Sequence, residues 1–253
     1  MPKLKNTVIL LLLIPLMACS GVGGDNDPTK GWSAARLYAE AKEAQQDENF
    51  ERAIELFETL EARYPFGRYA QQAQLDSAYA YYKFSEPDSA IANADRFIKL
   101  HPKSPHVDYA YYLKGLANFN RGDSFLSKII DRNPAERDPT PLKRAFEDFS
   151  ILIKTYPDSR YADDARQRMV FLRNELAEYE MNIANFYIRR EAYIAAANRA
   201  KHVLEYYQGA TSVPLALKTM IKSYRKLGLD DLANDAYRIL KQNYPAQAED
   251  LSI

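Results

Sequence analysis

The sequence predicts an all-α fold, an α-solenoid of about five paired helices, or helical hairpins, with a long insertion in the third. Small residues recur twelve positions apart, and a proline follows after twelve more. Glycine is scarce, with 9 in 253 residues, so the chain has few of the residues that strand turns need. Repeated helical units that bury their apolar faces only against their neighbours form a solenoid.

The composition is that of a folded protein without a nucleic-acid partner. Hydrophobic residues make up 47% of the chain and charged residues 27%, which is ordinary for a globular domain. Lysine and arginine total 34, and aspartate and glutamate also total 34. Because binding to nucleic acid needs a basic excess that neutralises phosphates, we expect no nucleic acid among the partners.

Residues 1–18 have the pattern of an export signal. Lys3 and Lys5 precede an apolar run from Val8 to Leu16, and the small Ala18 stands directly before Cys19. A membrane-spanning helix needs roughly 20 apolar residues, about twice the length of this run. We therefore expect the segment to direct export and to be removed.

The segment Leu16-Met17-Ala18-Cys19 resembles the lipobox of bacterial lipoproteins, in which cleavage precedes the cysteine and the cysteine carries the lipid. This resemblance implies a diacylglycerol and an N-acyl lipid on Cys19 and no other cofactor. Ser20 stands where an aspartate would resemble the inner-membrane retention signal, so the outer membrane is favoured. The alternative is a plain secretory signal with an unmodified Cys19.

The rest of the chain divides into a tether and a repeat domain. Residues 19–31 are predicted to be a lipidated flexible tether, because this stretch is rich in glycine, aspartate and asparagine. The repeat domain covers 32–253, with N-terminal repeats in 32–120 and C-terminal repeats in 142–253. Turn-forming residues fill the insertion between them, 121–141.

The repeats match the tetratricopeptide pattern of two antiparallel helices. Helices whose axes approach to about 8–10 Å need small side chains where they cross, and a proline ends the second helix. The third copy has Gly115 and Ala145 on either side of the insertion, and the fourth has Ala184 and Ala196 but Gln208 in place of the proline. The regular copies are Ala41, Ala53 and Pro65; Ala78, Ala90 and Pro102; and Ile221, Ala233 and Pro245.

Short pairs with proline are predicted to mark the ends of helices. They are Tyr64-Pro65, His101-Pro102, Tyr156-Pro157 and Tyr244-Pro245. After the third pair, Asp158 or Ser159 is expected to cap a new helix by accepting from free backbone N–H groups. That helix, from Tyr161 to Tyr179, is expected to continue into the fourth repeat.

Helical geometry predicts an aromatic trough on the concave face, lined by the first helices of the repeats. A peptide that ends in an aromatic residue and a free carboxylate would suit it, because the rings offer contact area and a lysine can pair with the carboxylate. The alternative is that the tyrosines simply pack between helices. The predicted lining residues are Tyr38, Lys42, Leu75, Tyr79, Tyr82, Lys83, Tyr109, Tyr112, Leu116 and Phe119.

Longer strings carry information beyond the repeat spacing. The most extensive is Tyr-Pro-Phe-Gly-Arg-Tyr-Ala-Gln-Gln-Ala-Gln-Leu-Asp-Ser-Ala-Tyr-Ala-Tyr-Tyr-Lys, residues 64–83. With the lipobox and the insertion, these strings resemble the BamD family, lipoproteins of the outer-membrane β-barrel assembly machine, over essentially the whole mature chain. The other strings are 95–102, 108–116, 138–139, 145–149, 161–180 and 193–199.

The resemblance implies a non-enzymatic scaffold anchored in the outer membrane and facing the periplasm. Its partners would be the periplasmic domains of the barrel-forming subunit BamA, the accessory lipoproteins BamC and BamE, and unfolded outer-membrane proteins, received through a C-terminal targeting signal. Gln208 and the wording of residues 125–133 depart from the family, so the contacts of the insertion stay open.

In the family, the later repeats contact BamA and an arginine of the fourth repeat is central, which implicates the matching pair Asn198-Arg199. We expect the Arg199 guanidinium to form a bidentate pair with a BamA carboxylate. Arg199→Glu is then expected to abolish co-purification with BamA and to leave the fold intact. The alternative is that Arg199 is a solvated helix residue.

Two other functions remain open from the sequence. One is a different periplasmic repeat lipoprotein that coordinates division or peptidoglycan synthesis. The other is a helical muramidase, which needs a carboxylic acid of raised pKa in a cleft and for which Glu180 is the candidate. No metal site is expected, because His101 and His106 have no nearby cysteine or paired acid.

Overall fold

The computed structural model describes residues 27–121 and 138–249. The predicted signal, Cys19, most of the predicted tether and most of the insertion lie outside these residues. The chain separates into two compact units, Met1–Ser33 and Ala34–Ile253. In the first unit, Thr29 donates from its backbone N and its hydroxyl to Asp27 Oδ1, over 2.9 and 2.6 Å, so the end of the predicted tether is a turn.

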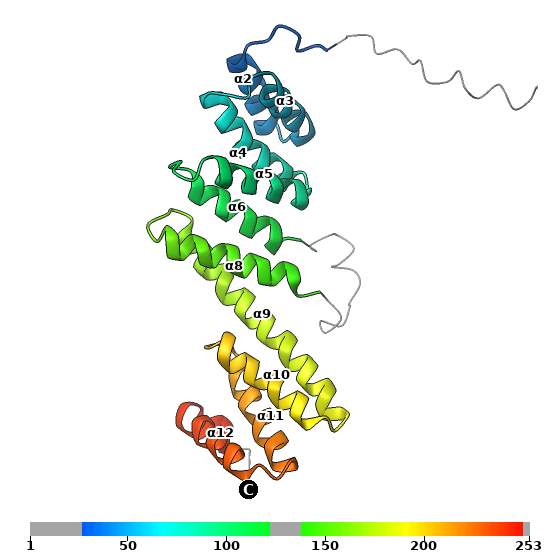
Figure 1. Ribbon diagram of the computed structural model, residues 1–253, viewed down its shortest axis with the longest axis vertical. Helices are drawn as coiled ribbons and strands as arrows, with labels where there is room; N and C mark the ends of the chain where they lie inside the picture. The colour runs from blue at the N-terminus through cyan, green and yellow to red at the C-terminus, as the bar shows by residue number, and fades with distance from the viewer. Residues whose placement is uncertain (1–26, 122–137, 250–253) are drawn as a thin grey trace, which may run out of the picture. The chain divides into compact units, whose positions relative to one another are not determined.

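The described residues of the second unit form eleven α-helices and no strand (Figure 1). This result confirms the predicted all-α class. None of these helices is long and apolar enough to cross a bilayer. The helices are α2 (Ala34–Gln46), α3 (Phe50–Arg63), α4 (Arg68–Lys83), α5 (Pro87–Leu100), α6 (Val107–Phe119), α8 (Thr140–Thr155), α9 (Ala162–Arg189), α10 (Tyr193–Tyr206), α11 (Val213–Lys226), α12 (Asp230–Asn243) and α13 (Pro245–Glu249).

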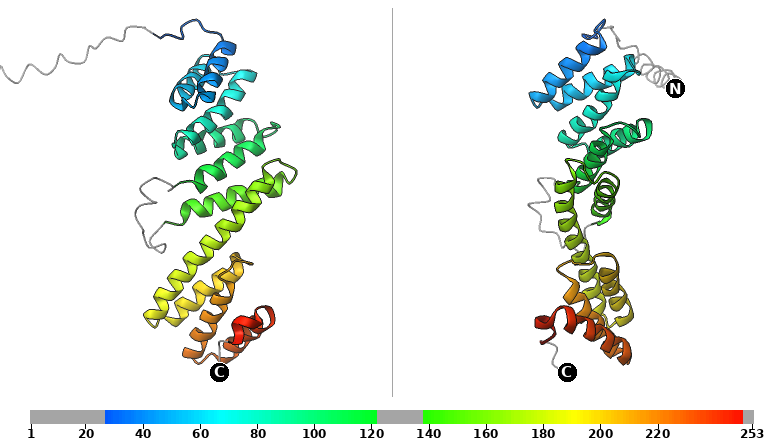
Figure 2. Two further views of the ribbon diagram at one scale, coloured as in Figure 1. Left: turned by 180° about the vertical axis from the view of Figure 1, so that it is seen from behind. Right: turned by 90° about the vertical axis from the view of Figure 1, so that its left-hand side faces the viewer.

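The helices of this unit pack mainly against their neighbours in the chain. The hairpins are α2–α3, α4–α5, α6–α8, α9–α10 and α11–α12, and each follows the previous one in chain order (Figure 2). First helices of successive hairpins also touch, as α2 does with α4, α4 with α6, and α9 with α11. The α-solenoid of five hairpins is therefore confirmed, and the first helices of the first three hairpins share one face.

The predicted prolines stand where helices end. Tyr64, His101, Tyr156 and Tyr244 are the C-cap residues of α3, α5, α8 and α12, and each donates its backbone N–H to the carbonyl four residues earlier. The following proline has no N–H with which to continue the helix. In the fourth hairpin, which lacks the proline, Tyr207 caps α10 in the same way.

Small residues at the predicted crossings are buried. The alanines at 41, 53, 78, 90, 145, 184, 196 and 233 are at most 1% exposed. At Gly115 an added Cβ would lie 2.3 Å from Cε1 of Phe149, a ring that is fully buried. Only glycine therefore allows α6 to approach α8 this closely.

The long α9 confirms that the helix after Tyr161 continues into the fourth repeat. It spans Ala162–Arg189, 28 residues, and both α8 and α10 pack against it. Its first half completes the third hairpin's core with Leu172, and its second half pairs with α10 through Met181 and Ala184. The predicted cap by Asp158 or Ser159 is wrong, because the N-cap residue of α9 is Tyr161 and no side chain caps this helix. Ser159 instead accepts a hydrogen bond from the backbone N–H of Tyr161, just before the helix begins.

Candidate functional site

The predicted trough residues lie on the first helices of the first three hairpins, which share one face of the second unit. Two of them, Leu75 and Leu116, are at most 9% exposed, so they belong largely to the core between hairpins. The others are half-buried or exposed. By helix they are Tyr38 and Lys42 on α2, Leu75, Tyr79, Tyr82 and Lys83 on α4, and Tyr109, Tyr112, Leu116 and Phe119 on α6.

A tyrosine–aspartate–lysine group joins α2 to α4. Tyr38 donates its hydroxyl hydrogen to Asp76 Oδ2 over 2.7 Å, and Lys42 Nζ lies 3.2 Å from Asp76 Oδ1. Lys42 also donates to Gln45 Oε1 over 2.8 Å. Burial, and then the hydrogen bond to Asp76, raise the pKa of Tyr38 above its ordinary value. Tyr38 is therefore a hydroxyl donor at every physiological pH.

Lys83 lies in a different environment. Its Nζ is 5.7 Å from the centroid of the Phe50 ring, and that ring meets Tyr79 edge-on at 6.4 Å. Its side chain is exposed. Lys42 and Arg168 each pair with an aspartate, whereas Lys83 has no acidic partner among the residues that the structure describes.

A second polar group joins α6 to α9. Tyr112 donates its hydroxyl hydrogen to Asp164 Oδ2 over 2.7 Å, and Arg168 Nε donates to the same oxygen over 2.6 Å. The Arg168 guanidinium also lies 5.0 Å from the centroid of Phe119. Burial, followed by the hydrogen bond to Asp164, raises the pKa of Tyr112 to about 12. The two aspartates of the trough are thus each held by a tyrosine and a cation.

Aromatic stacking continues the trough from α6 to the start of α9. Tyr161 stacks on Tyr109 and Tyr112, with ring centroids 5.0 and 4.7 Å apart. Tyr82 on α4 accepts a hydrogen bond of 2.6 Å from Asn120 Nδ2. Sequence reasoning did not include Tyr161, Asp164 or Arg168 in the trough. The four-residue spacing of Asp164 and Arg168 is a signal from which their ion pair could have been predicted, but it does not show that Tyr112 and Phe119 lie beside them.

Arg199 forms an ion pair within its own chain. Its Nη1 lies 3.0 Å from Oε2 of Glu180, whose side chain is 2% exposed, while the Arg199 side chain is 43% exposed. Asn198 is exposed beside it. Arg199→Glu would set a second carboxylate against the buried Glu180, so we now expect this change to lower the stability of the fold. Glu180, the candidate acid of a muramidase, is a buried carboxylate that forms an ion pair with Arg199.

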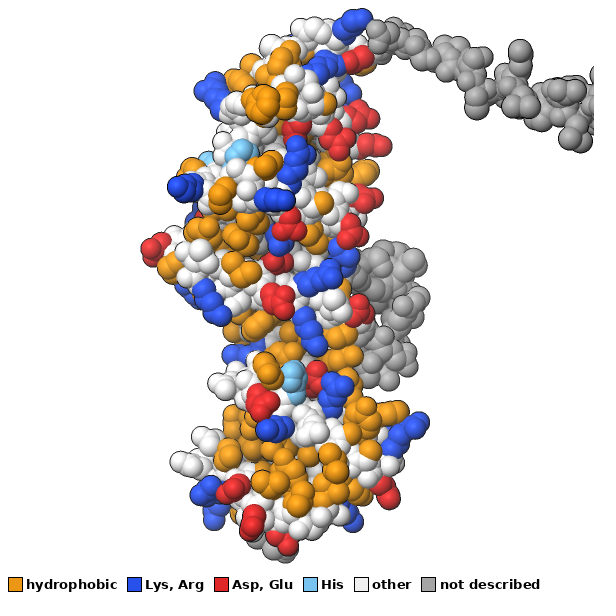
Figure 3. Space-filling model, viewed as in Figure 1, with side chains coloured by type: hydrophobic (Ala, Val, Ile, Leu, Met, Phe, Trp, Pro, Cys, Tyr) orange, Lys and Arg blue, Asp and Glu red, His pale blue; other side chains and the backbone are white. Residues whose placement is uncertain are grey.

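Hydrophobic side chains gather on the surface of the C-terminal hairpins. Figure 3 shows them over the lower part of this face, where α10 to α12 lie. Single exposed apolar residues are common, but a group of this kind often marks a protein-binding surface. The large exposed hydrophobic residues of α10 to α12 and their connections are Ile194, Tyr206, Leu215, Leu229, Leu232 and Ile239.

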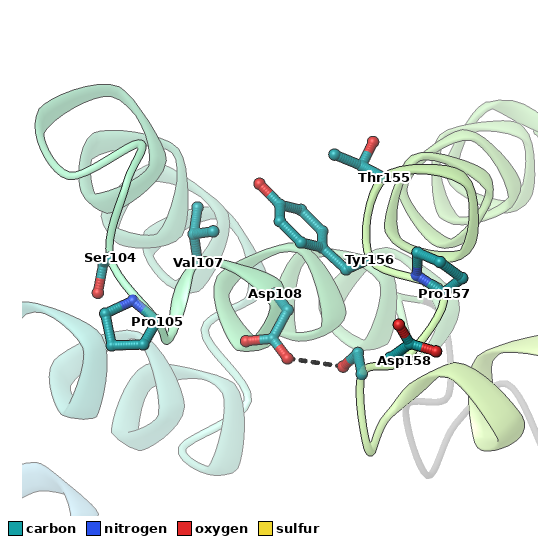
Figure 4. A pocket seen from close by; sticks show the side chains of 9 residues that line it. Ser104, Pro105, Val107, Asp108, Thr155, Tyr156, Pro157 and Asp158 are labelled. Atoms are coloured by element: carbon teal, nitrogen blue, oxygen red, sulfur yellow. Dashed lines mark hydrogen bonds between the residues drawn. The ribbon is translucent and has the colours of Figure 1, made fainter.

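A cavity of about 370 Å³ lies between the connection from α5 to α6 and the connection from α8 to α9 (Figure 4). Ser159 donates its hydroxyl hydrogen to Asp108 Oδ2 over 2.7 Å across its wall. The residues of the predicted trough do not line it. Within the described ranges, no group of three or more histidine, cysteine, aspartate or glutamate residues is placed to hold a metal ion.

Comparison with known proteins gives matches over nearly the whole chain. A family model described as YfiO, an outer membrane lipoprotein, matches residues 31–239. The outer membrane protein assembly factor BamD of Neisseria meningitidis serogroup A is 44% identical, over 97% of this chain and 92% of the relative. BamD of Vibrio cholerae is 38% identical over 92% of this chain and 96% of the relative. BamD of Haemophilus influenzae is 32% identical over 96% of this chain and 92% of the relative.

Proposed function

Because this chain belongs to the YfiO family of outer membrane lipoproteins, whose relatives are named outer membrane protein assembly factor BamD, we propose that it is a non-enzymatic scaffold of the β-barrel assembly machine. The observation that carries this proposal is the 44% identity over 97% of the chain. A stack of helical hairpins supports it, because such stacks present extended surfaces for other polypeptides. The three relatives all share the assembly-factor name, which favours this function over a role in division or peptidoglycan synthesis.

The trough is the part of the scaffold that would receive unfolded outer-membrane proteins. Its rings offer amphipathic contact area to an extended peptide with an aromatic end. Its aspartates, Asp76 and Asp164, are already paired with Lys42 and Arg168, so they repel an incoming carboxylate less than free acids would. Lys83 has no acidic partner within the described ranges, and the Phe50 and Tyr79 rings lie beside it. We assign the peptide's terminal carboxylate to Lys83 and its last ring to Phe50 and Tyr79.

Binding of a short peptide tests this assignment. The probe is a ten-residue peptide with a terminal phenylalanine and a fluorophore at its N-terminus, followed by anisotropy. Lys83→Gln should weaken binding about threefold to tenfold, the usual effect of losing a charge-assisted contact at a partly exposed site. Lys241→Gln, at an exposed position in the last turn of α12, is the matched control and should change nothing. Equal binding by both variants would exclude Lys83 as the carboxylate partner.

The C-terminal hairpins would hold the BamA periplasmic domains, with BamC and BamE as further partners. The exposed apolar residues of α10 to α12 supply contact area, and Arg199 keeps Nη2 and Nε for a partner carboxylate while Nη1 holds Glu180. Arg199→Lys keeps a positive charge near Glu180 but lacks the planar fork. We expect it to fold normally and to lose most BamA when tagged chain is purified from detergent-solubilised envelopes. Retention of BamA at the wild-type level would contradict this contact.

The membrane attachment would be a lipid on Cys19, which lies outside the described residues. The lipobox supports this, as does the matching family of outer membrane lipoproteins. Intact-mass measurement of the purified chain should show a diacylglycerol and an N-acyl chain on a polypeptide that begins at Cys19. Cys19→Ala should abolish that mass increase and leave the chain in the soluble periplasmic fraction. An unmodified, soluble wild-type chain would overturn the proposed anchor.

A further inference from the structure

Asp76 and Asp164 each accept a hydrogen bond from a tyrosine of the trough and a second one from a cation, but their donors are arranged differently. In the first group both donors, Tyr38 and Lys42, are on α2, and the acceptor Asp76 is on α4. Residues four apart on a helix lie on the same face, so the hydroxyl and the ammonium group are neighbours whether or not Asp76 is present. Gln45 accepts from Lys42 and helps to hold it there.

In the second group the donors lie on different helices. Tyr112 is on α6, whereas Arg168 is on α9 together with Asp164, four residues before it. Phe119 and Tyr112, both on α6, also contact the Arg168 guanidinium, so these donors stay near each other only while α9 keeps its packing on α6. The first group has both donors on one helix and is therefore the better preformed site for a carboxylate other than its present occupant.

We propose that Tyr38 and Lys42 form a carboxylate-binding site that Asp76 fills in the unbound chain, and that a carboxylate of a bound polypeptide takes the place of Asp76. This inference rests on the proposed binding of unfolded outer-membrane proteins in the trough. The ligand is the carboxylate of an acidic side chain, because the terminal carboxylate of the peptide is assigned to Lys83. The exchange replaces one carboxylate by another on the same donors, so its cost is small.

Partial exposure makes the exchange feasible. The Asp76 side chain is 22% exposed and that of Lys42 is 33% exposed, so an Asp76 carboxylate that turns away from α2 reaches water instead of a dry core. Asp76 then acts as an internal competitor. When no peptide is bound, the Asp76 carboxylate neutralises the charge of Lys42. Because a ligand carboxylate must displace Asp76, the wild-type chain prefers acidic ligands less strongly than a chain without this aspartate would.

Four peptides of one sequence test the proposal. They end in phenylalanine with a free acid or an amide, and they carry glutamate or glutamine at one internal position. Asp76→Asn keeps an acceptor for Tyr38 but removes the competing charge. We expect it to tighten binding about threefold to tenfold for the peptides that carry glutamate and for no others. A gain that follows the free acid instead would contradict both this ligand and the assignment of the terminal carboxylate to Lys83.

Further variants separate the outcomes. Lys42→Met in the Asp76→Asn background should cancel the gain, and Asp164→Asn should produce none. Thermal unfolding followed by circular dichroism checks that each variant folds, and Asp76→Ser serves as a second neutral variant. If all four peptides bind Asp76→Asn and the wild type equally, the trough binds peptides and the exchange is wrong. If none binds either protein, the proposed peptide-binding function fails together with the exchange.

Discussion

The hydroxyl oxygen of Tyr112 on α6 lies 2.7 Å from Asp164 Oδ2 on α9, and the two residues are 52 positions apart in the chain. This bond crosses from the third hairpin to the fourth. Since each hairpin of a solenoid contacts only its neighbours, such bonds between hairpins determine how rigidly the stack is held.

Tyr112→Phe should therefore weaken the junction between these hairpins. The ring and its stacking on Tyr161 remain, so the loss is that of one hydrogen bond to a charged acceptor, about 1–2 kcal/mol in the free energy of unfolding. Urea denaturation measures this change. Tyr206→Phe, at a position that is 64% exposed, is the control and should change stability by less than about 0.5 kcal/mol. Equal effects of the two substitutions would contradict the role of the Tyr112 hydroxyl.

The same carboxyl group predicts a dependence on pH. Burial alone would raise the pKa of Asp164, but the hydrogen bonds from Arg168 and Tyr112 outweigh it and hold this pKa below its ordinary value of 3.8. A carboxyl with a lower pKa in the folded state adds stability above its unfolded pKa and loses that stability as the pH falls through the folded pKa. The wild type should exceed Asp164→Asn in stability at about pH 7, and the difference should shrink towards about pH 3.

Urea denaturation of both proteins across this pH range checks the prediction. Asp163→Asn, which neutralises a side chain that is 91% exposed, is the matched control and should follow the wild type closely. A difference between wild type and Asp164→Asn that stays constant down to about pH 3 would show that the Asp164 charge does not stabilise the fold.

Gly115→Ala should destabilise the third hairpin, because its Cβ would lie 2.3 Å from the Phe149 ring. Phe149 is fully buried and cannot move aside without disturbing α8, so the expected loss is about 2 kcal/mol. Phe149→Leu makes room and should cost less in the Gly115→Ala background than in the wild type. Additive losses in the double variant would show that the two positions do not collide.

Arg199→Glu should lower stability by about 2 kcal/mol, less than for a fully buried pair, because the Arg199 side chain is 43% exposed. The change leaves the Glu180 carboxylate buried without its cation and adds a like charge. Adding Glu180→Gln to this variant should restore part of the loss, as thermal unfolding will show. If Arg199→Glu unfolds at the wild-type temperature, the ion pair does not stabilise the fold, and the expectation from the sequence that this variant folds normally is confirmed.

The hairpins and their ends could be predicted from the amino-acid sequence alone. Helix crossings need small residues, and proline ends helices, so small residues and prolines recur at a regular spacing that can be seen in one sequence. The continuous α9 and the buried Gly115 follow from the same local rules. The trough residues could also be placed on their helices, because the face that a residue occupies depends only on helical geometry.

Which polar groups contact one another could be read only from the packed structure. Tyr38 bonds to Asp76, which is 38 residues away in the chain, and Tyr112 bonds to Asp164, which is 52 residues away. Arg199 bonds to Glu180 across the turn between α9 and α10. These pairings depend on how far one hairpin is rotated relative to the next and on side-chain rotamers. The spacing of the repeats in the sequence specifies neither. For that reason the sequence predicted an aromatic trough with two lysines but could not show that, among the described residues, Lys42 pairs with an aspartate and Lys83 does not.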